Sequence, residues 1–316
     1  MFNLTKKVIS LSLGAYLTFS PISVIGEPSK KEWLIEQIMD SRQGVYQKIK
    51  YGGVEMHAFL RSPWKHKIKV ASAVCPYLPD FNSEEDSEED KVREFAPKGQ
   101  KLEQIVSAYE IQSGENVLAA INGSFFNTET YHIVGREVVN GRRIQRKTEF
   151  KKDMIAISTV KTNWKPKPGY PDYKNRASLL IDSEGIPKIG YFNDISNADY
   201  FLTAGWMLVS EGVNVWERAR INEQFDNYHL KSKYRSAIAI TGHGNFLMLT
   251  TAKTTIDKLS DILMKLGVKS AMCLDSGSSV QMVLDKTYNK TGHIRKDNYL
   301  IHGTQRNIVN GIVVVE

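Results

Sequence analysis

Hydrophobic and polar positions alternate along much of the chain with the two-residue period of β-strands. The segment from Val54 to Leu60 alternates in this way, and an apolar run from Ile68 to Val74 follows it. Since successive side chains of a strand point to opposite faces of a sheet, both segments are predicted to be strands, in a strand-rich body that begins at Gly44. Ser236 to Thr241 and Asn245 to Thr250 predict a hairpin.

Helical spacing is confined to a few short segments. Residues 27–43, Leu102 to Tyr109 and Ile256 to Leu266 carry apolar residues three and four positions apart, and Gly267 stands where the last helix is expected to end. Three apolar runs are expected to be buried strands: Val117 to Asn122, Ala271 to Leu274 and Ile308 to Val315. Many strands and few helices predict an α+β fold with an extensive mixed or antiparallel sheet.

The first 26 residues have the three-part pattern of a secretory signal peptide. Lys6 and Lys7 precede an apolar run from Val8 to Phe19, and small residues follow as far as Gly26. That run is shorter than the roughly 20 residues a spanning helix needs, so cleavage is expected, with a retained N-terminal anchor as the alternative. The expected location is secreted, periplasmic or in the cell envelope, with no transmembrane span after cleavage.

Composition and charge fit a folded protein that acts on an anionic partner. The 316 residues are 41% hydrophobic and 24% charged, which suffices for a substantial core. The formal charge of +7 falls to about +5 when Lys6 and Lys7 are removed with the signal peptide. This mild basic bias favours an anionic substrate or envelope surface and is not a nucleic-acid signature, so no nucleic-acid partner is expected.

The cysteines and loops add little chemistry. Cys75 and Cys273 lie in apolar runs, so buried free thiols are expected, with a disulfide between them as the alternative. Neither CxxC nor HExxH occurs, and no cofactor is expected, with a divalent metal as the alternative that remains open. The acidic run of residues 83–90 predicts a solvated loop, and the proline-rich stretch 161–175 predicts an irregular one.

Four apolar strands end in small polar or charged residues, and these ends are candidates for a shared site. The four segments are Ala119 to Phe126, Tyr234 to Ile238, Leu274 to Ser279 and Gln305 to Asn310. Strand ends that meet at one rim of a sheet can form a pocket, so the active-site pocket is expected there.

The residues at that rim suit a phosphorylated sugar. Arg235 and Arg306 are candidates to hold phosphate oxygens in two-pronged pairs. Asp275 is the single carboxylate expected near the reacting carbon, and small residues after it allow backbone N–H groups to approach an anion. Structural ion pairs for the arginines, and helix capping by Asp275 or Ser276, are the alternatives that remain open.

The order and spacing of these segments resemble the phosphodiester glycosidase family. Residues 119–126 resemble its AAINGGFF motif, residues 204–212 its GGPxLVxxG motif, residues 235–239 its RTAIG motif and residues 271–279 its AxNLDGGGSS motif. Residues 134–141 resemble its PxG…NG hairpin, with Ile133 in place of the usual proline, and residues 306–310 resemble its closing strand. The likeness spans roughly residues 44–316, which are expected to form the catalytic domain.

The resemblance implies cleavage of a sugar, such as N-acetylglucosamine, from a sugar-1-phosphate diester in an anionic glycan or related conjugate. By resemblance, the catalytic candidates are Asp275, Arg235 and Arg306. The candidate substrate-binding residues are Asn122, Gly123, Gly205, Ser276, Gly277, Ser279 and Asn310. Phe125 or Trp206 is a candidate to stack on a sugar, although core packing is the commoner fate of such residues. Ser276 and Ser278 replace family glycines, and residues 250–253 lack the family's Asp-Gly-Arg.

Three other functions fit parts of the pattern. The glycine replacements favour an inactive glycan-binding or envelope-binding protein on the same fold. Asp275-Ser276-Gly277 has the form of an aspartic protease loop, but those enzymes need two such aspartates and the chain has no second D-[ST]-G. A serine nucleophile is opposed by the lack of a G-x-S-x-G elbow; a histidine such as His302 is expected to lie on a surface loop.

Overall fold

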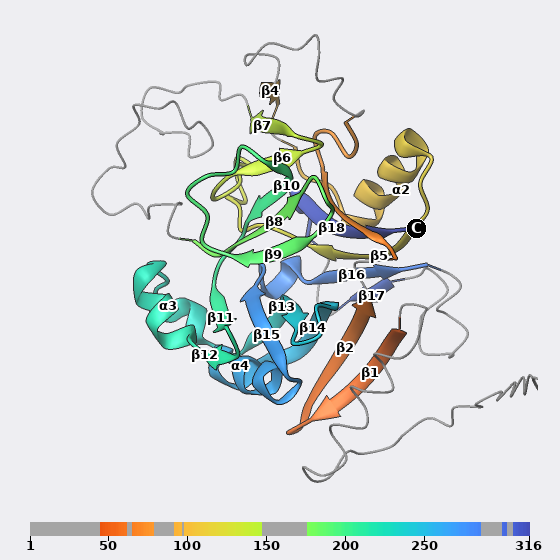
Figure 1. Cartoon of the computed structure of the whole chain (residues 1–316). Helices are drawn as coiled ribbons and strands as arrows, with labels where there is room; N and C mark the ends of the chain where they lie inside the picture. The colour runs from red at the N-terminus through yellow and green to blue at the C-terminus, as the bar shows by residue number, and fades with distance from the viewer. Residues whose placement is uncertain are drawn as a thin grey trace, which may run out of the picture.

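The computed structural model describes residues 45–61, 65–78, 92–96, 98–146, 176–285, 299–301 and 306–316. Within these ranges the chain forms three sheets with short helices around them (Figure 1). The predicted signal peptide, the predicted helix of 27–43, the acidic run and the loop of 161–175 lie outside the described residues.

The largest sheet has seven strands in the order β1-β2-β14-β13-β15-β11-β12, and every neighbouring pair is antiparallel. Its strands are β1 (Val45–Tyr51), β2 (Val54–Arg61), β14 (Phe246–Thr254), β13 (Lys233–Thr241), β15 (Val268–Cys273), β11 (Met207–Ser210) and β12 (Val213–Asn214). β13 and β14 form the predicted hairpin; β13 begins three residues before its predicted start, and β14 begins one residue later and ends four residues later than predicted.

The second sheet has five antiparallel strands in the order β17-β16-β5-β18-β3. They are β17 (Tyr299–Ile301), β16 (Gln281–Leu284), β5 (Val117–Asn122), β18 (Asn310–Val315) and β3 (Lys67–Ser72). β5 has the bounds predicted from its apolar run. Its side chains are buried on both faces, because the seven-stranded sheet covers one face and α2 (Leu102–Ser113) covers the other.

The third sheet has six strands in the order β4-β7-β6-β10-β8-β9. They are β4 (Val92–Phe95), β7 (Arg142–Arg146), β6 (Glu137–Val139), β10 (Ala198–Thr203), β8 (Ser178–Asp182) and β9 (Pro187–Gly190). Only the β4–β7 pair is parallel in this sheet.

The remaining helices border the seven-stranded sheet. α4 (Ile256–Lys265) packs against β11 and β15, and α3 (Trp216–Asn222) packs against β11 (Figure 1). Two 3₁₀ turns, η3 (Asn227–Leu230) and η4 (Gly277–Ser279), flank the strand ends that form the candidate site. Among the described residues, no helix combines the length and apolar character needed to cross a bilayer.

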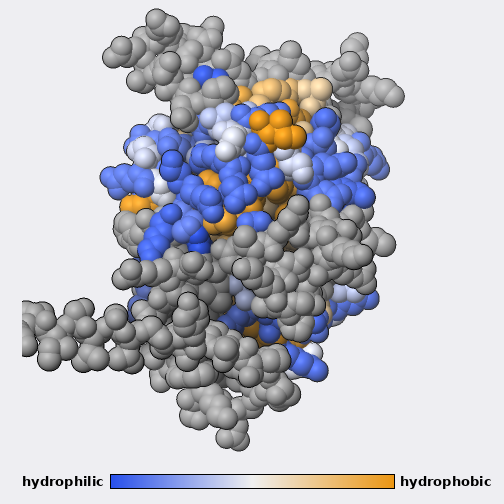
Figure 2. Space-filling model, turned by 90° about the vertical axis from the view of Figure 1, so that its right-hand side faces the viewer, coloured by the Kyte–Doolittle hydropathy of each residue, from blue (hydrophilic) through white to orange (hydrophobic). Residues whose placement is uncertain are grey.

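One hydrophobic core joins the three sheets. Phe59 and Met248 enter it from the first sheet, Ile121 from the second, and Leu179 and Leu202 from the third. The fold is therefore α+β with mostly antiparallel sheets, as the sequence predicts. Figure 2 shows one face of the molecule, on which hydrophilic residues cover most of the coloured surface and apolar residues form small patches, as is usual for a folded protein.

Both cysteines are free thiols. Cys75 is half-buried and Cys273 is buried in the core. The expectation of buried thiols therefore holds for Cys273 and holds in part for Cys75, and the alternative of a Cys75–Cys273 disulfide is not what the structure contains.

Candidate functional site

Asn122, the last residue of β5, links three of the predicted segments. Its side-chain amide donates to the backbone carbonyl of Asp275 at 2.9 Å. Its oxygen accepts from the Ser236 hydroxyl at 2.6 Å and from the Gln281 backbone N–H at 3.1 Å. Because a buried amide with all these bonds fixes the segments around it, the ends of β5 and β15 and the start of β16 are held together beside β13.

A second buried network positions the turn after β5. The Asn310 side-chain oxygen accepts from the Ser124 backbone N–H at 2.8 Å, and its amide nitrogen lies 3.1 Å from Glu137 Oε1. The backbone carbonyl of Asn310 accepts from Gly123 N–H at 3.0 Å, and a Cβ added at Gly123 would lie 2.3 Å from Asn310 Oδ1. Only glycine therefore fits at position 123 without displacing Asn310.

Asp275 lies in the loop after β15 and is half-buried. The backbone N–H of Ser276 donates to its Oδ1 at 2.8 Å. Burial raises the pKa of the Asp275 carboxyl, and the hydrogen bond from the Ser276 N–H and the charges of Arg306 and Lys233 oppose that rise. The Asp275 carboxylate is therefore more basic than usual, and its charge interacts with those of Arg306 and Lys233.

Gly277 shapes the loop that follows. Its φ of 74° is in the left-handed region, which favours glycine, and a Cβ built on it would meet nothing within 4 Å. Backbone conformation, and not crowding, therefore demands glycine here. Ser276 can replace the family glycine because its φ is −123°, an extended conformation open to any residue.

Arg306 reaches this loop from the segment before β18. Its backbone N–H donates to the Ser278 carbonyl at 3.2 Å, and its own carbonyl accepts from Gln281 Nε2 at 2.8 Å. The guanidinium carbon lies 5.7 Å from the centroid of the Phe126 ring. Nε of Arg306 is buried and has no hydrogen-bond partner among the described residues. A guanidinium that has a spare buried N–H donor, and whose charge acts on Asp275, can bind an anionic ligand.

Arg235 has different surroundings. It is buried, and its guanidinium donates to the carbonyls of His229 and Lys231, both at 2.7 Å. Nε lies 3.3 Å from the Thr254 carbonyl, and Nη1 lies 3.5 Å from the Ser276 hydroxyl. Arg235 therefore joins the η3 turn to the loop that carries Asp275. Its predicted contact with phosphate stays a prediction.

Four side chains near the site were not singled out from the sequence. Lys233 begins β13, two residues before Arg235, and its charge acts on Asp275. Residues two apart on a strand share a face, so the spacing of Lys233 to Arg235 indicates in the sequence that both side chains lie on the same face. His229 on η3 contacts the rings of Phe125 and Phe225. Burial lowers the His229 pKa to about 4, so the imidazole is neutral at pH 7.

The other two are carboxyl groups, Glu137 and Glu223, which are fully buried. Glu223 accepts from the backbone N–H groups of Ala177 and Met207 at 3.1 and 2.8 Å, and from the Tyr191 hydroxyl at 2.9 Å. Burial raises the Glu223 pKa. No sequence signal marks these residues, because their burial depends on segments far apart in the chain.

Gly205 and Trp206 lie beside Glu223. Gly205 has a φ of 61°, and a Cβ there would lie 2.4 Å from Glu223 Oε2, so glycine is needed for packing. Trp206 is buried and stacks on Phe225 with ring centroids 4.8 Å apart. Trp206 is therefore a core residue, whereas Phe125 is partly buried and packs against the core edge. A substrate contact by Gly205 stays a prediction.

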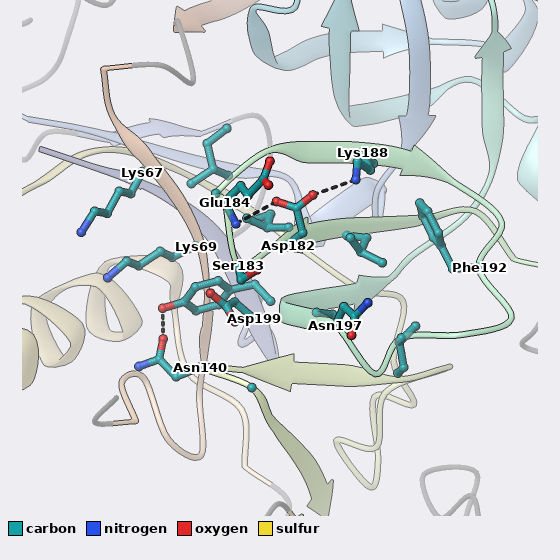
Figure 3. Close-up of a pocket in the computed structure, with 18 of the residues that line it drawn as sticks. Lys67, Lys69, Asn140, Asp182, Ser183, Glu184, Lys188, Phe192, Asn197 and Asp199 are labelled. Atoms are coloured by element: carbon teal, nitrogen blue, oxygen red, sulfur yellow. Dashed lines mark hydrogen bonds and ion pairs between the residues drawn. The ribbon is translucent and has the colours of Figure 1, made fainter. Parts of the chain in front are cut away.

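A separate polar groove of about 1360 Å³ lies between β3 and the β8–β9 hairpin (Figure 3). Asp182, which ion-pairs with Lys188 at 2.7 Å, lines it together with Asn140, Asn197 and Asp199. None of the predicted site residues lines this groove. No group of three or more His, Cys, Asp or Glu side chains in the described ranges is arranged to hold a metal ion.

Two solved structures share the fold of this chain. The zebrafish N-acetylglucosamine-1-phosphodiester alpha-N-acetylglucosaminidase catalytic domain, auto-inhibited by its pro-peptide, superposes with a TM-score of 0.56 at 14% identity, over 87% of this chain and 82% of that one. A hypothetical protein from Synechocystis superposes with a TM-score of 0.52 at 13% identity, over 86% of this chain and 61% of that one. Both likenesses concern the fold.

No curated protein matches the sequence significantly. The sequence model of the phosphodiester glycosidase family matches residues 115–315, a span that contains Asn122, Arg235, Asp275 and Arg306. That span is more than half of the 316 residues. The chain therefore belongs to the phosphodiester glycosidase family.

Proposed function

We propose that this protein is a hydrolase that releases a sugar, of the N-acetylglucosamine type, from a sugar-1-phosphodiester in an envelope glycan or a related conjugate. Membership of the phosphodiester glycosidase family supports glycosidase chemistry on such esters. The observation that carries the proposal is the half-buried Asp275 carboxylate, which accepts a hydrogen bond from the Ser276 N–H and whose charge interacts with that of Arg306.

The proposed hydrolysis needs one carboxylate that acts at the anomeric carbon. In this reaction the bond between the anomeric carbon and the phosphate oxygen breaks, water supplies a hydroxyl to the sugar, and a phosphate monoester leaves. Asp275 acts at the anomeric carbon, as nucleophile or as the base that takes a proton from water. Its raised pKa makes it a better proton acceptor than an exposed aspartate, which favours the role of base.

The leaving group explains why a second acidic residue is not required. Ordinary glycosidases use two carboxyl groups, one of which protonates the leaving oxygen. A phosphate monoester is a weak base and leaves without strong protonation, provided that its charge is stabilised. Arg306, with a spare buried Nε donor, is placed to stabilise that charge.

The proposed domain and location follow from the sequence pattern. Residues 44–316 are proposed to form one catalytic domain, supported by the shared core of the three sheets and by the family match over 115–315. The protein is proposed to be secreted or held in the cell envelope, supported by the signal-peptide pattern of residues 1–26.

A non-catalytic glycan-binding protein is the second candidate, favoured by Ser276 and Ser278 in place of family glycines. Release of free sugar from a panel of N-acetylglucosamine-1-phosphodiesters separates the two. Wild-type protein should release sugar, and folded Asp275→Asn protein should not. A folded wild-type protein that binds the panel without releasing sugar would favour the binding function.

A further inference from the structure

The polar groove between β3 and the β8–β9 hairpin has a buried floor whose polar groups already have partners. The Asn140 side chain accepts from the Tyr200 hydroxyl and donates to the Leu78 carbonyl, so its amide is held at both ends. Lys69 is also buried, and its Nζ donates to Glu115 Oε1 at 2.8 Å. Because these bonds fix the side chains in place, the floor is formed before any ligand binds.

The groove is large for a site that binds one small molecule. Its volume of about 1360 Å³ exceeds the roughly 300–1000 Å³ that is usual for such a site. Figure 3 shows Lys67 and Phe192 at opposite ends of the lining residues, with Asp182 and Ser183 between them. An extended ligand of several units therefore fits the groove better than a single compact molecule.

Charged side chains of both signs line the groove. Lys65 and Lys67 stand on the β3 side and Glu184 on the turn of the β8–β9 hairpin, and all three are exposed. None of these three forms an ion pair with another described residue within 4.0 Å. In all, four lysines and five acidic side chains line the groove. A ligand with charges of a single sign would therefore meet like charges on part of the lining.

Two uncharged rings also line the groove. His66 has no hydrogen-bond partner for its Nδ1 among the described residues. Burial, together with the charges of Arg61 and Lys65, lowers the His66 pKa to about 4, so the imidazole is neutral at pH 7. It can then donate from one nitrogen and accept at the other. Phe192 is half-buried and packs edge-on against Phe201 with ring centroids 6.1 Å apart, which holds its apolar surface in a fixed orientation.

We propose that the polar groove binds an uncharged oligosaccharide of several sugar units, at a carbohydrate site separate from Asp275. Each sugar hydroxyl can donate and accept at once, so it pairs with lysine, carboxylate and amide groups alike and is repelled by neither sign of charge. The apolar face of one sugar ring packs on Phe192. The preformed floor reduces the ordering cost of binding.

The groove and the Asp275 loop lie toward opposite ends of β10. Ala198, at the start of this strand, lines the groove. At the other end, the Thr203 carbonyl accepts from Ser124 Oγ at 2.7 Å, in the turn whose Gly123 carbonyl binds the Asp275 N–H. The six residues of β10 place these two points about 15 Å apart, at about 3.3 Å per residue. The groove can therefore hold a glycan whether or not Asp275 hydrolyses one.

The test is calorimetric titration of full-length wild-type protein with tetrasaccharides. Chitotetraose, cellotetraose and maltotetraose are uncharged probes that differ in linkage and in the acetamido group, and tetragalacturonate is an acidic chain of the same length. At least one uncharged probe should bind. Tetragalacturonate should bind at least about tenfold more weakly, because the acidic side chains of the lining repel it.

Two variants place a bulky ring in the groove from different segments. Ser183→Trp lies on the β8–β9 turn and Asn197→Trp lies just before β10, and both positions are exposed and line the groove. Each change should weaken binding of the uncharged probe at least about tenfold, because the added ring occupies the space of the ligand. Asn222→Trp is the matched control, since Asn222 is an exposed residue of α3 outside the lining. It should leave binding unchanged.

Failure of this inference can be distinguished from failure of the proposed function. The absence of binding by every uncharged probe, or binding that both groove variants leave unchanged, would overturn the carbohydrate site. Equal binding of tetragalacturonate would overturn its preference for uncharged chains. Sugar release from an N-acetylglucosamine-1-phosphodiester, measured in the same variants, should match wild type. Groove-dependent binding without any sugar release would overturn the hydrolase and keep the carbohydrate site.

Discussion

The side chain of Asn122 holds the backbone of Asp275: Nδ2 of Asn122 lies 2.9 Å from the Asp275 carbonyl oxygen. The bond crosses from the end of a strand in the five-stranded sheet to the end of a strand in the seven-stranded sheet. The position of the candidate catalytic carboxylate is thus set by the contact between two sheets, and its loop cannot shift without breaking a buried hydrogen bond.

Replacing Asn122 should destabilise the folded protein. Asn122→Ala removes three hydrogen bonds and leaves the Ser236 hydroxyl and the Gln281 N–H without their acceptor. The free energy of unfolding should fall by about 3 kcal/mol, since each stranded buried group costs about 1–3 kcal/mol. Urea unfolding measures this. Asn227→Ala, at an exposed residue of η3, should change it by about 0.5 kcal/mol or less.

Arg235 should prove to be a positioning residue. Arg235→Lys keeps the charge but cannot reach the carbonyls of His229, Lys231 and Thr254 at once. We expect a loss of about 2–4 kcal/mol of unfolding free energy and faster amide hydrogen exchange in residues 226–232. A rise in KM with unchanged stability and exchange would instead assign Arg235 to the substrate phosphate. Arg220→Lys, at a surface bond to Asn227, is the control.

Replacing Arg306, in contrast, should lower activity with little effect on stability. Its Nε has no partner among the described residues, so Arg306→Gln should change the unfolding free energy by less than about 1 kcal/mol. The value of kcat/KM should fall about 100-fold, which corresponds to about 2.7 kcal/mol of lost transition-state stabilisation. Steady-state kinetics beside urea unfolding test this. A destabilised but fully active variant would remove Arg306 from phosphate binding.

Asp275→Asn should stabilise the unliganded protein in a pH-dependent way. The pKa of Asp275 is higher in the folded protein than its ordinary value, so its stabilising contribution is complete below that ordinary value. It is lost as pH rises through the folded pKa. Asp275→Asn has no carboxyl to ionise at this position, so its stability does not fall in this way. The difference in stability between the variant and wild type should therefore increase in favour of the variant as pH rises above about 4, and then level off. Melting temperatures of both proteins from pH 4 to 8 give the difference; a gain that shrinks with pH contradicts the raised pKa.

The meeting of the strand ends could be predicted because apolar runs that end in polar residues are visible along the sequence. Val117–Asn122 and the run before Asp275 show this pattern, and the structure joins them through Asn122. The partners of Arg235 could not be predicted. They are backbone carbonyls of His229 and Lys231, and every residue type has a backbone carbonyl, so the sequence does not indicate which carbonyls bind the guanidinium.

The burial of Glu223 and the need for glycine at position 205 could not be predicted from the sequence either. Glu223 lies just after a short helix with exposed polar residues, and its sequence surroundings suggest exposure; it is buried because the backbone of Ala177 and Met207 binds it. Gly205 is glycine because that carboxyl leaves no space for a Cβ. Such pairings depend on tertiary contacts between segments that no periodicity connects. Lys233, in contrast, could have been found from its two-residue spacing to Arg235.

We propose that Asp275 carries out the hydrolysis of a sugar-1-phosphodiester. The most direct measurement is the release of free N-acetylglucosamine from its 1-phosphodiesters by wild-type and Asp275→Asn protein, with folding of both verified by circular dichroism and unfolding curves. We expect wild type to release the sugar and a folded Asp275→Asn protein to release it at least about 1000-fold more slowly, the scale of losing an essential group. Equal release by both proteins would contradict it.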